Sequence, residues 1–256
     1  GELAAAYTRD KFADRADEMA AAGVQAWELG LEAQGSQLRG RLQQWRQQQA
    51  LSKFHVVSLG GGPGCDAAGF ALFCLEALEV VQLQLDVFDL GSAWQPYCET
   101  ALDAVAQESA VSADIDVHGH FGEADLHQPL GSSVNSALRE RCEVCDVFLF
   151  SYCLHESRAC FEEEHPLLCE LFATARAGAI FLVLDVYQAA VAEVPALLHR
   201  QGWTAQPLHR GGTRDGAPCP AADAAPSAHV GALAFEVLPL GGSRDFPFNG
   251  VLVHKR

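Results

Sequence analysis

The residues best suited to chemistry begin with a glycine turn at residues 60–64, which has the sequence Gly-Gly-Gly-Pro-Gly. Gly60, Gly62 and Gly64 can adopt backbone angles that other residues avoid, and they leave room for a ligand against the main chain. The turn lies between an apolar stretch and a predicted helix at 65–79. Such a helix points the free N–H groups of its first turn at the ligand. The pattern is typical of a nucleotide-type binding turn.

Two aspartates follow predicted strands further along the chain. Asp89 ends a strand at 81–89, and Asp125 comes shortly after a strand at 114–121. An adenosine ligand needs a carboxylate for its ribose hydroxyls, which Asp89 could supply, and an acceptor for its amino group, which Asp125 could supply. Each residue also has a structural alternative, because Asp89 could cap the next helix and Asp125 could belong to a turn. Together with the glycine turn, the two acids are stronger evidence than the turn alone.

A further polar group follows the apolar strand predicted at 144–150. Ser151 is a candidate contact to the ligand, and Tyr152 could line the reacting site. His155 could act as a general base beside a substrate hydroxyl. The alternatives are that Tyr152 packs in the core and that His155 does no catalytic work. Asp185 ends the next predicted strand, where it could hold a substrate amine or cap a helix.

These residues need a parallel sheet to bring them together. Five apolar strands alternate with helices, which predicts an α/β fold with right-handed crossovers and a doubly wound sheet. Ligands of such sheets lie beyond the carboxyl ends of the strands, where all of these residues fall. Two last strands, at 233–238 and 251–255, are expected to form an antiparallel hairpin, giving a mainly parallel seven-stranded sheet. The five parallel strands are expected at 54–59, 81–89, 114–121, 144–150 and 179–185. The helices are expected at 65–79, 94–108, 133–141, 158–176 and 194–201. An extended segment is expected at 203–209 and a long loop at 211–231.

The N-terminal region, residues 1–53, is predicted to be a helical cap in front of a Rossmann-like domain at 54–256. Apolar residues recur at helical spacing within it, and Gly23, Gly30 and Gly35 interrupt the pattern. We therefore expect two or three helices. Two roles remain open for them, namely a lid over a substrate and simple structural packing.

The composition narrows the range of partners. The chain has 256 residues, of which 49% are hydrophobic and 20% charged, and its net charge is −16. The acidic excess argues against DNA as a partner, although Arg39, Arg41, Arg46 and Lys53 form a small basic cluster. No apolar run approaches the length that spans a bilayer, so no membrane partner is expected.

The cysteines indicate a reducing compartment. Nine cysteines form an odd count without the spacing of a disulfide framework, which favours free thiols and a cytoplasmic or nuclear location. Cys142 and Cys145 are spaced as in some zinc sites, but no second pair with matching spacing follows, and no metal is expected. The chain starts at Gly1 without a methionine, which leaves open that its native N-terminus is truncated.

Residues 54–256 resemble the class I S-adenosylmethionine-dependent methyltransferases. The glycine turn resembles the first motif of that family, Asp89 its ribose-binding acid, 122–125 its adenine-binding segment and 150–156 its segment after the fourth strand. The resemblance implies S-adenosyl-L-methionine as cofactor. Ser58 stands where the family usually carries an acid that positions the methionine end of the cofactor, and Asp66 is a candidate replacement. The motif of the nucleic-acid amino-methyltransferases, Asn/Asp-Pro-Pro-Tyr, is absent after the fourth strand.

The acceptor and two other functions remain open at this stage. The acidic chain favours a small molecule or a protein segment as methyl acceptor over RNA. RNA would be reached through the basic N-terminal cluster or a partner subunit. The first alternative function is a nicotinamide-dependent oxidoreductase, because Gly62, Gly64 and Ala67 also fit the relaxed dinucleotide-binding pattern. The second is a catalytically silent subunit or sensor that binds the cofactor without turnover.

Overall fold

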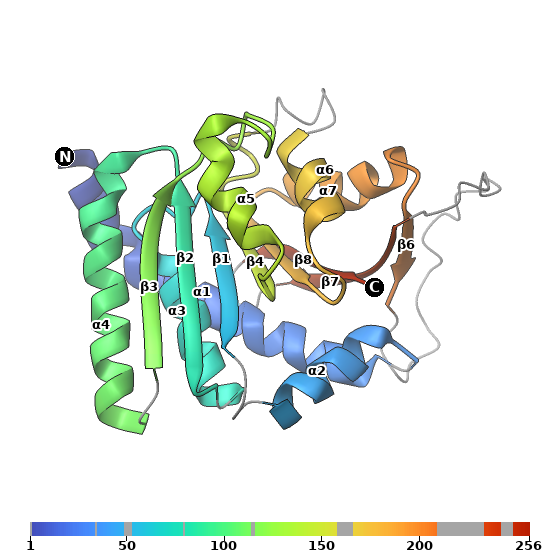
Figure 1. The fold of residues 1–256 in the computed structure, drawn as a ribbon, viewed down its shortest axis with the longest axis horizontal. Helices are drawn as coiled ribbons and strands as arrows, with labels where there is room; N and C mark the ends of the chain where they lie inside the picture. The colour runs from blue at the N-terminus through green and yellow to red at the C-terminus, as the bar shows by residue number, and fades with distance from the viewer. Residues whose placement is uncertain are drawn as a thin grey trace.

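In a computed structural model of the chain, the strands of the described residues form one eight-stranded sheet (Figure 1). These residues are 2–33, 35–48, 53–78, 80–113, 116–157, 166–208, 233–241 and 248–256. The loop predicted at 211–231 and the first half of the helix predicted at 158–176 lie outside them. The strands are β1 (Phe54–Leu59), β2 (Gln82–Asp89), β3 (Asp116–Glu123), β4 (Val147–Ser151), β5 (Ile180–Asp185), β6 (Thr204–Pro207), β7 (Ala234–Gly241) and β8 (Asn249–Lys255).

The strand order is β3-β2-β1-β4-β5-β8-β7-β6. The five strands β1 to β5 pair in parallel, and β8 runs antiparallel to both of its neighbours, β5 and β7. The doubly wound, mainly parallel sheet and the antiparallel pairing of the last two strands are therefore confirmed. The expected number of seven strands is wrong, because the extended segment after α7 (Gln188–Arg200) pairs in parallel with β7 as an eighth, edge strand.

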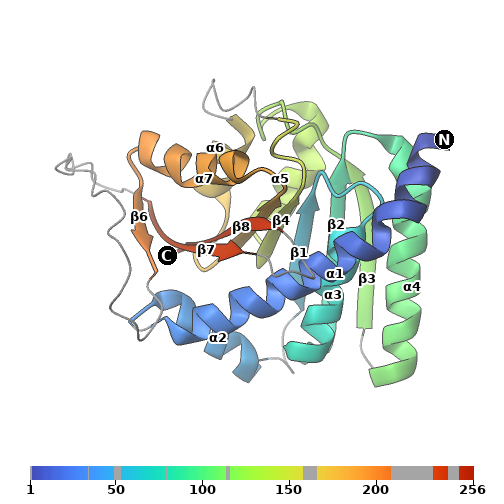
Figure 2. The ribbon, with the colours of Figure 1, turned by 180° about the vertical axis from the view of Figure 1, so that it is seen from behind.

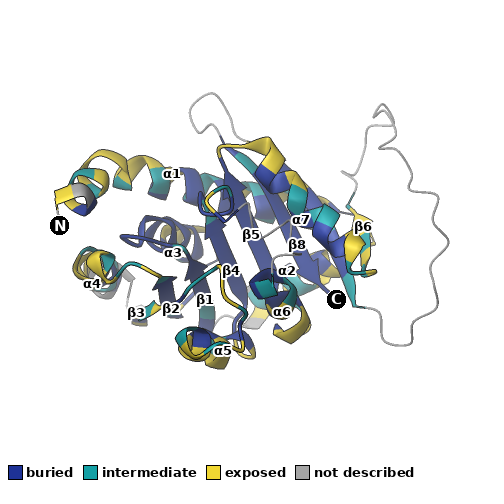
Figure 3. Ribbon diagram, turned by 90° about the horizontal axis from the view of Figure 1, so that it is seen from above, coloured by how far each residue is buried: buried dark blue, intermediate teal, exposed yellow. Residues whose placement is uncertain are grey.

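Helices cover both faces of this sheet (Figures 1 and 2). One face carries α1 (Glu2–Glu32), α2 (Gln37–Gln48), α3 (Cys65–Ala77) and α4 (Gln95–Ala113), and the other carries α5 (Ser136–Cys142), α6 (Pro166–Thr174) and α7. Seen from above, the central strands are buried on both sides, and the exposed residues lie on the outer surfaces of the helices (Figure 3). Helix α7 begins six residues earlier than predicted and contains Pro195. None of the helices in the described ranges is long and apolar enough to cross a membrane.

The N-terminal region contains two helices, and α1 is longer than its glycines suggest. Gly23 and Gly30 were expected to interrupt the helix, yet α1 runs through both. They are packing positions, because a Cβ atom would lie 2.8 Å from the Phe73 ring at Gly23 and 2.6 Å from Leu42 Cδ1 at Gly30. Gly35, with a φ of +71°, lies between α1 and α2, where the chain turns. The glycines therefore let α1 approach its neighbours closely.

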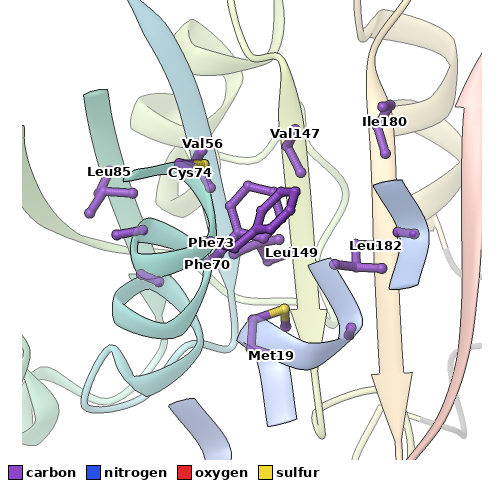
Figure 4. Packing of buried hydrophobic residues seen from close by; sticks show 14 of the residues in the cluster. Met19, Val56, Phe70, Phe73, Cys74, Leu85, Val147, Leu149, Ile180 and Leu182 are labelled. Atoms are coloured by element: carbon purple, nitrogen blue, oxygen red, sulfur yellow. The ribbon is translucent and has the colours of Figure 1, made fainter. Parts of the chain in front are cut away.

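Side chains from α1 belong to the same buried cluster as those of the sheet (Figure 4). Met19 packs with Phe70 and Phe73 of α3 and with alternate side chains of β4 and β5, such as Leu149 and Leu182. Burying one such side chain contributes about 1.5–3 kcal/mol. The N-terminal helices are thus held to the sheet by the hydrophobic effect.

A buried carboxylate ties α2 to the sheet. Glu236 of β7 accepts hydrogen bonds from the N–H groups of Gln37 and Leu38 at 3.0 and 2.8 Å. Ser36 Oγ donates to the same side chain at 2.9 Å, and His254 Nδ1 lies 3.1 Å from it. The carboxylate therefore satisfies N–H groups at the start of α2 that the helix itself leaves free.

Candidate functional site

The glycine turn joins β1 to α3 and has left-handed backbone angles at three positions. The φ angles are +64° at Gly60, +50° at Gly62 and +82° at Gly64, in the region that favours glycine. Gly61, which the sequence did not single out, is sterically required as well, because a Cβ atom there would lie 2.2 Å from Ser58 Oγ. The turn thus presents main chain rather than side chains to its surroundings.

A cavity of about 240 Å³ opens above this turn at the carboxyl ends of the parallel strands. Of the predicted site residues, those lining it are Gly60, Gly62, Asp66, Asp89, Asp125, Ser151 and Tyr152. Ser58, Gly64 and His155 do not belong to the part of its lining that the structure describes. The roles assigned to all ten residues stay predictions.

Asp89 accepts hydrogen bonds from the main chain of two segments, the glycine turn and the segment after β2. Its Oδ2 accepts the N–H of Gly62 at 3.0 Å, and its Oδ1 accepts the N–H of Gly91 at 2.9 Å. Gly91 directly precedes the short 3₁₀ helix η1 (Ser92–Trp94), which has no side-chain cap, so Asp89 holds the residue before this helix and does not cap it. Each carboxylate oxygen keeps further acceptor capacity, and Asp89 is only half-buried. It can therefore support the turn and still accept hydrogen bonds from a ligand.

Asp125 likewise both stabilises a turn and lines the cavity. Its Oδ1 accepts the N–H of His127 at 2.9 Å, which is the turn arrangement that the sequence left open. The fully buried Asn135 accepts the N–H of Asp125 at 2.9 Å and donates to three backbone carbonyl oxygens, including that of Asp125. The segment is thus fixed by a side chain that the sequence analysis had not noticed.

Ser58 and Asp66 form a buried pair beneath the turn. Ser58 Oγ donates to Asp66 Oδ2 at 2.8 Å, and the N–H of Ala67 donates to Asp66 Oδ1 at 2.7 Å. Burial raises the pKa of the Asp66 carboxyl to about 7, against the effect of these hydrogen bonds. The sequence suggested that Asp66 replaces an acid missing at position 58, and the structure brings the two side chains into contact.

Tyr152 and His155 lie in different surroundings. Tyr152 lines the cavity with a φ of +61°, and its hydroxyl donates to Oε2 of Glu18 in α1 at 2.5 Å. Burial and the adjacent Glu18 carboxylate raise the pKa of Tyr152, which disfavours its use as a base. His155 instead has its Nδ1 3.1 Å from Oδ2 of the buried Asp185.

Helix α1 contributes residues to the cavity that the sequence analysis missed. Tyr7 and Arg15 both line it, and the Tyr7 ring meets Trp94 edge to face at 5.6 Å. The Arg15 guanidinium lies 3.3 Å from the centre of the Tyr152 ring and pairs with Glu18 at 2.8 Å. A signal existed in the sequence, since residues at positions 7, 15 and 18 share one face of a helix. The roles left open for the N-terminal helices were a lid over a substrate and structural packing. Helix α1 packs on the sheet and also contributes side chains to the cavity.

Cys65, Cys74, Cys98, Cys142, Cys145 and Cys153 are buried and carry free thiols. Cys142 and Cys145 are buried, and burial raises the pKa of both thiols. Within the described ranges no cluster of three or more His, Cys, Asp or Glu residues is arranged to hold a metal ion. The thiols here serve as small apolar side chains.

No protein-family model and no curated protein matches the chain. Solved structures that resemble it include a precorrin-6y C5,15-methyltransferase from Geobacter metallireducens, with 7% identity and a TM-score of 0.42 over 86% of this chain and 88% of that one. A methyltransferase from Pyrococcus furiosus has 8% identity and a TM-score of 0.44 over 85% and 83%. An O-methyltransferase family protein from Burkholderia thailandensis has 14% identity and a TM-score of 0.43, and the match covers 79% of this chain and 51% of that one. At identities and TM-scores this low the likeness carries no statement about activity, and the fold described above rests on strand order and register.

Proposed function

We propose that this protein is a methyltransferase that uses S-adenosyl-L-methionine. The observation that carries the proposal is the meeting of the glycine turn, Asp89 and Asp125 around one cavity. These residues come from the ends of different strands, and in doubly wound sheets ligands bind at such an edge. The resemblance noted in the sequence assigns the same residues to this cofactor.

The side chains present fit that cofactor. Gly60 and Gly61 both line the cavity, and a Cβ atom would collide with Cys153 at Gly60 and with Ser58 at Gly61. Asp89 would hold the ribose hydroxyls and Asp125 the adenine amino group. Asp89, Asp125 and Glu156 also line the cavity, and carboxylates there suit a ligand that carries a sulfonium and an ammonium group.

The cofactor, when bound, supplies a methyl group already activated by its positive sulfur. The protein then has to position an acceptor, and orientation alone can account for about 7–11 kcal/mol of a barrier. Tyr7 and Arg15 of α1, together with Trp94, would exclude water from the bound cofactor. The contact of Arg15 with the Tyr152 ring and of Tyr7 with Trp94 supports a lid role for α1.

The acceptor in this proposal is a small molecule or a basic protein segment. The net charge of −16 and the carboxylates around the cavity support it. RNA is the alternative, reached through the basic N-terminal cluster or a partner subunit. Arg41 of that cluster is engaged within the fold, 3.3 Å from Asp146 and 5.0 Å from the centre of the Trp45 ring, and is less available to a phosphate. Tight and salt-sensitive RNA binding by this chain would overturn the preference.

The free thiols support a reducing compartment, cytoplasmic or nuclear.

Calorimetric titration with S-adenosylmethionine and S-adenosylhomocysteine tests the proposal. We expect Asp89→Ala to weaken binding at least about tenfold, which corresponds to about 1.4 kcal/mol. Asp116→Ala is the matched control, because Asp116 is an exposed aspartate at the start of β3 and should leave binding unchanged. No binding by the unmodified protein would refute the cofactor assignment, and titration with NADH and NADPH would follow. Binding without S-adenosylhomocysteine formation on any acceptor would favour a silent, cofactor-binding subunit.

A further inference from the structure

His155 is held by a buried carboxylate at the carboxyl end of the neighbouring strand. Asp185, the last residue of β5, is fully buried. Its Oδ2 accepts the N–H of His155 at 3.2 Å and lies 3.1 Å from Nδ1 of the same residue. Its Oδ1 accepts the N–H of Tyr187 at 3.0 Å. The imidazole ring is thus tied down through both its main chain and its side chain.

This arrangement decides which ring nitrogen of His155 carries the proton. A carboxylate offers only acceptor oxygens, so Nδ1 must be the donor in the pair. In a neutral ring Nε2 then has a free lone pair, which is the state of a general base. Nε2 has no hydrogen-bond partner among the described residues. The Tyr187 ring, edge to face at 5.3 Å, further fixes the plane of the imidazole.

The surroundings of His155 connect it to the cavity and to an exposed apolar surface. Cys153, Glu156 and Ser157, on either side of it in the chain, line the cavity. The His155 side chain is 29% exposed and is not itself part of the described lining, although these neighbours in the chain are. Val186 and Tyr187 are 44% and 58% exposed, and the Tyr187 ring lies against His155, so the two residues offer an apolar surface next to the imidazole. An aromatic ring in this place would contact Tyr187 while a substituent on it reached His155.

We propose that the methyl acceptor is a phenol, that His155 is the general base for its hydroxyl, and that Asp185 positions His155. The inference rests on the proposed function and deepens it. A hydroxyl needs a base because its proton must leave, whereas a thiolate, thioether or neutral nitrogen needs none. As the acceptor oxygen bonds to the methyl carbon, its proton passes to Nε2 of His155 and the carbon–sulfur electron pair stays on sulfur. The products are a methyl ether, S-adenosylhomocysteine and an imidazolium ion paired with Asp185.

The tautomer of His155 can be measured without substrate or cofactor. In a protein with ¹⁵N-labelled histidine, two-dimensional NMR of the ring nitrogens reports which one is protonated, and His155→Gln assigns the signal. We expect a neutral ring with the proton on Nδ1 under mildly alkaline conditions. A proton on Nε2, or an imidazolium under those conditions, would overturn the assignment of His155 as base.

Asp185→Asn tests the positioning role with the same signal. An amide at position 185 can offer an N–H to the ring, so we expect the Nδ1-protonated form to lose its dominance while the circular dichroism of the fold is retained. His118 is the internal control, because its ring is exposed and pairs with Asp116 rather than Asp185. If Asp185→Asn does not fold, the tautomer measured in the unmodified protein still decides the proposal.

Acceptor probes then test the substrate class. Catechol carries phenolic hydroxyls, while thiophenol has a similar ring but ionises without help. We expect His155→Gln to lower kcat/KM for catechol by about 100-fold or more and to change the rate with thiophenol little. Equal losses with both probes would overturn the base role. Cofactor binding without methylation of phenol, catechol or a longer phenolic probe would overturn the acceptor class, whereas failure to bind the cofactor would refute the proposed function itself.

Discussion

The hydroxyl of Tyr152 donates a 2.5 Å hydrogen bond to Oε2 of Glu18, which joins the end of β4 to the middle of α1. The two residues are 134 positions apart in the chain. Arg15 completes the contact from above the Tyr152 ring. A cavity wall built from the sheet is thereby bonded to a wall built from the N-terminal helix.

Removing this hydroxyl should loosen α1. We expect Tyr152→Phe to lower the free energy of unfolding by about 1.5–3 kcal/mol, because a charged acceptor that is largely buried loses its donor. Hydrogen exchange should speed up in the first half of α1 more than in its second half, which packs on α3. Tyr187→Phe is the control for stability, since that side chain is 58% exposed. Unchanged exchange in α1 would mean that Tyr152 does not hold the helix.

The crossing of α1 and α3 depends on Gly69. A Cβ atom at this position would lie 2.0 Å from the carbonyl oxygen of Ala16, so α1 would have to move away. We expect Gly69→Ala to destabilise the protein by about 2 kcal/mol or more, as overpacking does. Gly40→Ala, in α2 with no neighbour within 4 Å, should instead stabilise it by about 0.5–1 kcal/mol through helix propensity. Urea denaturation of both variants measures the difference, and the same sign for both would contradict the close crossing.

The buried carboxyl of Asp66 should make stability depend on pH near neutrality. Burial raises its pKa from 3.8 to about 7, so between these values the native state binds a proton that the unfolded state has released. The contribution of Asp66 to stability therefore falls as the pH rises across this window and is constant above it. We expect Asp66→Asn to gain stability relative to the unmodified protein between about pH 4 and about pH 7, by up to about 4 kcal/mol.

Denaturant titrations at about pH 5 and about pH 8 would measure this difference. Asp103→Asn, an exposed change on α4, should show the same stability difference from the unmodified protein at both pH values. A stability difference for Asp66→Asn that does not grow with pH would show that Asp66 is ionised throughout this range.

The contact between Glu236 and α2 should fail at low pH. Burial alone would raise the pKa of Glu236, but the N–H groups of Leu38 and Gln37 and the donors Ser36 and His254 lower it from 4.5 to about 2. Its contribution is present above the unfolded pKa and is lost as the pH falls toward 2. We expect Glu236→Gln to cost about 2–3 kcal/mol at neutral pH and progressively less under acid conditions.

Thermal or urea unfolding of Glu236→Gln across the acid range would follow this loss. Glu99→Gln provides the comparison, because Glu99 is exposed on α4 and should change stability by less than about 0.5 kcal/mol. A cost of Glu236→Gln that stays constant down to low pH would contradict a charged Glu236.

The sequence alone was sufficient for the doubly wound, mainly parallel arrangement and for the glycine turn, because both depend on local patterns. Apolar strands alternating with helices predict a doubly wound sheet, and the carboxyl ends of its strands then bring Gly60, Asp89 and Asp125 to one edge. The eighth strand was missed since Thr204–Pro207 is short and mostly exposed, and only its pairing with β7 makes it a strand. The interruption expected at Gly23 and Gly30 was wrong for a similar reason, because their role is close packing rather than chain breaking.

Tertiary structure decided which functional side chains contact one another. Nothing in the local pattern relates Arg15 and Glu18 to Tyr152, or His155 to Asp185, because these contacts depend on how helices and strands distant in the chain pack. The sequence determined which residue types stand at each strand end. Packing of the apolar faces then determined which of those polar groups lie within hydrogen-bonding distance of one another. A buried polar group has few possible partners, and it bonds to those that packing brings next to it.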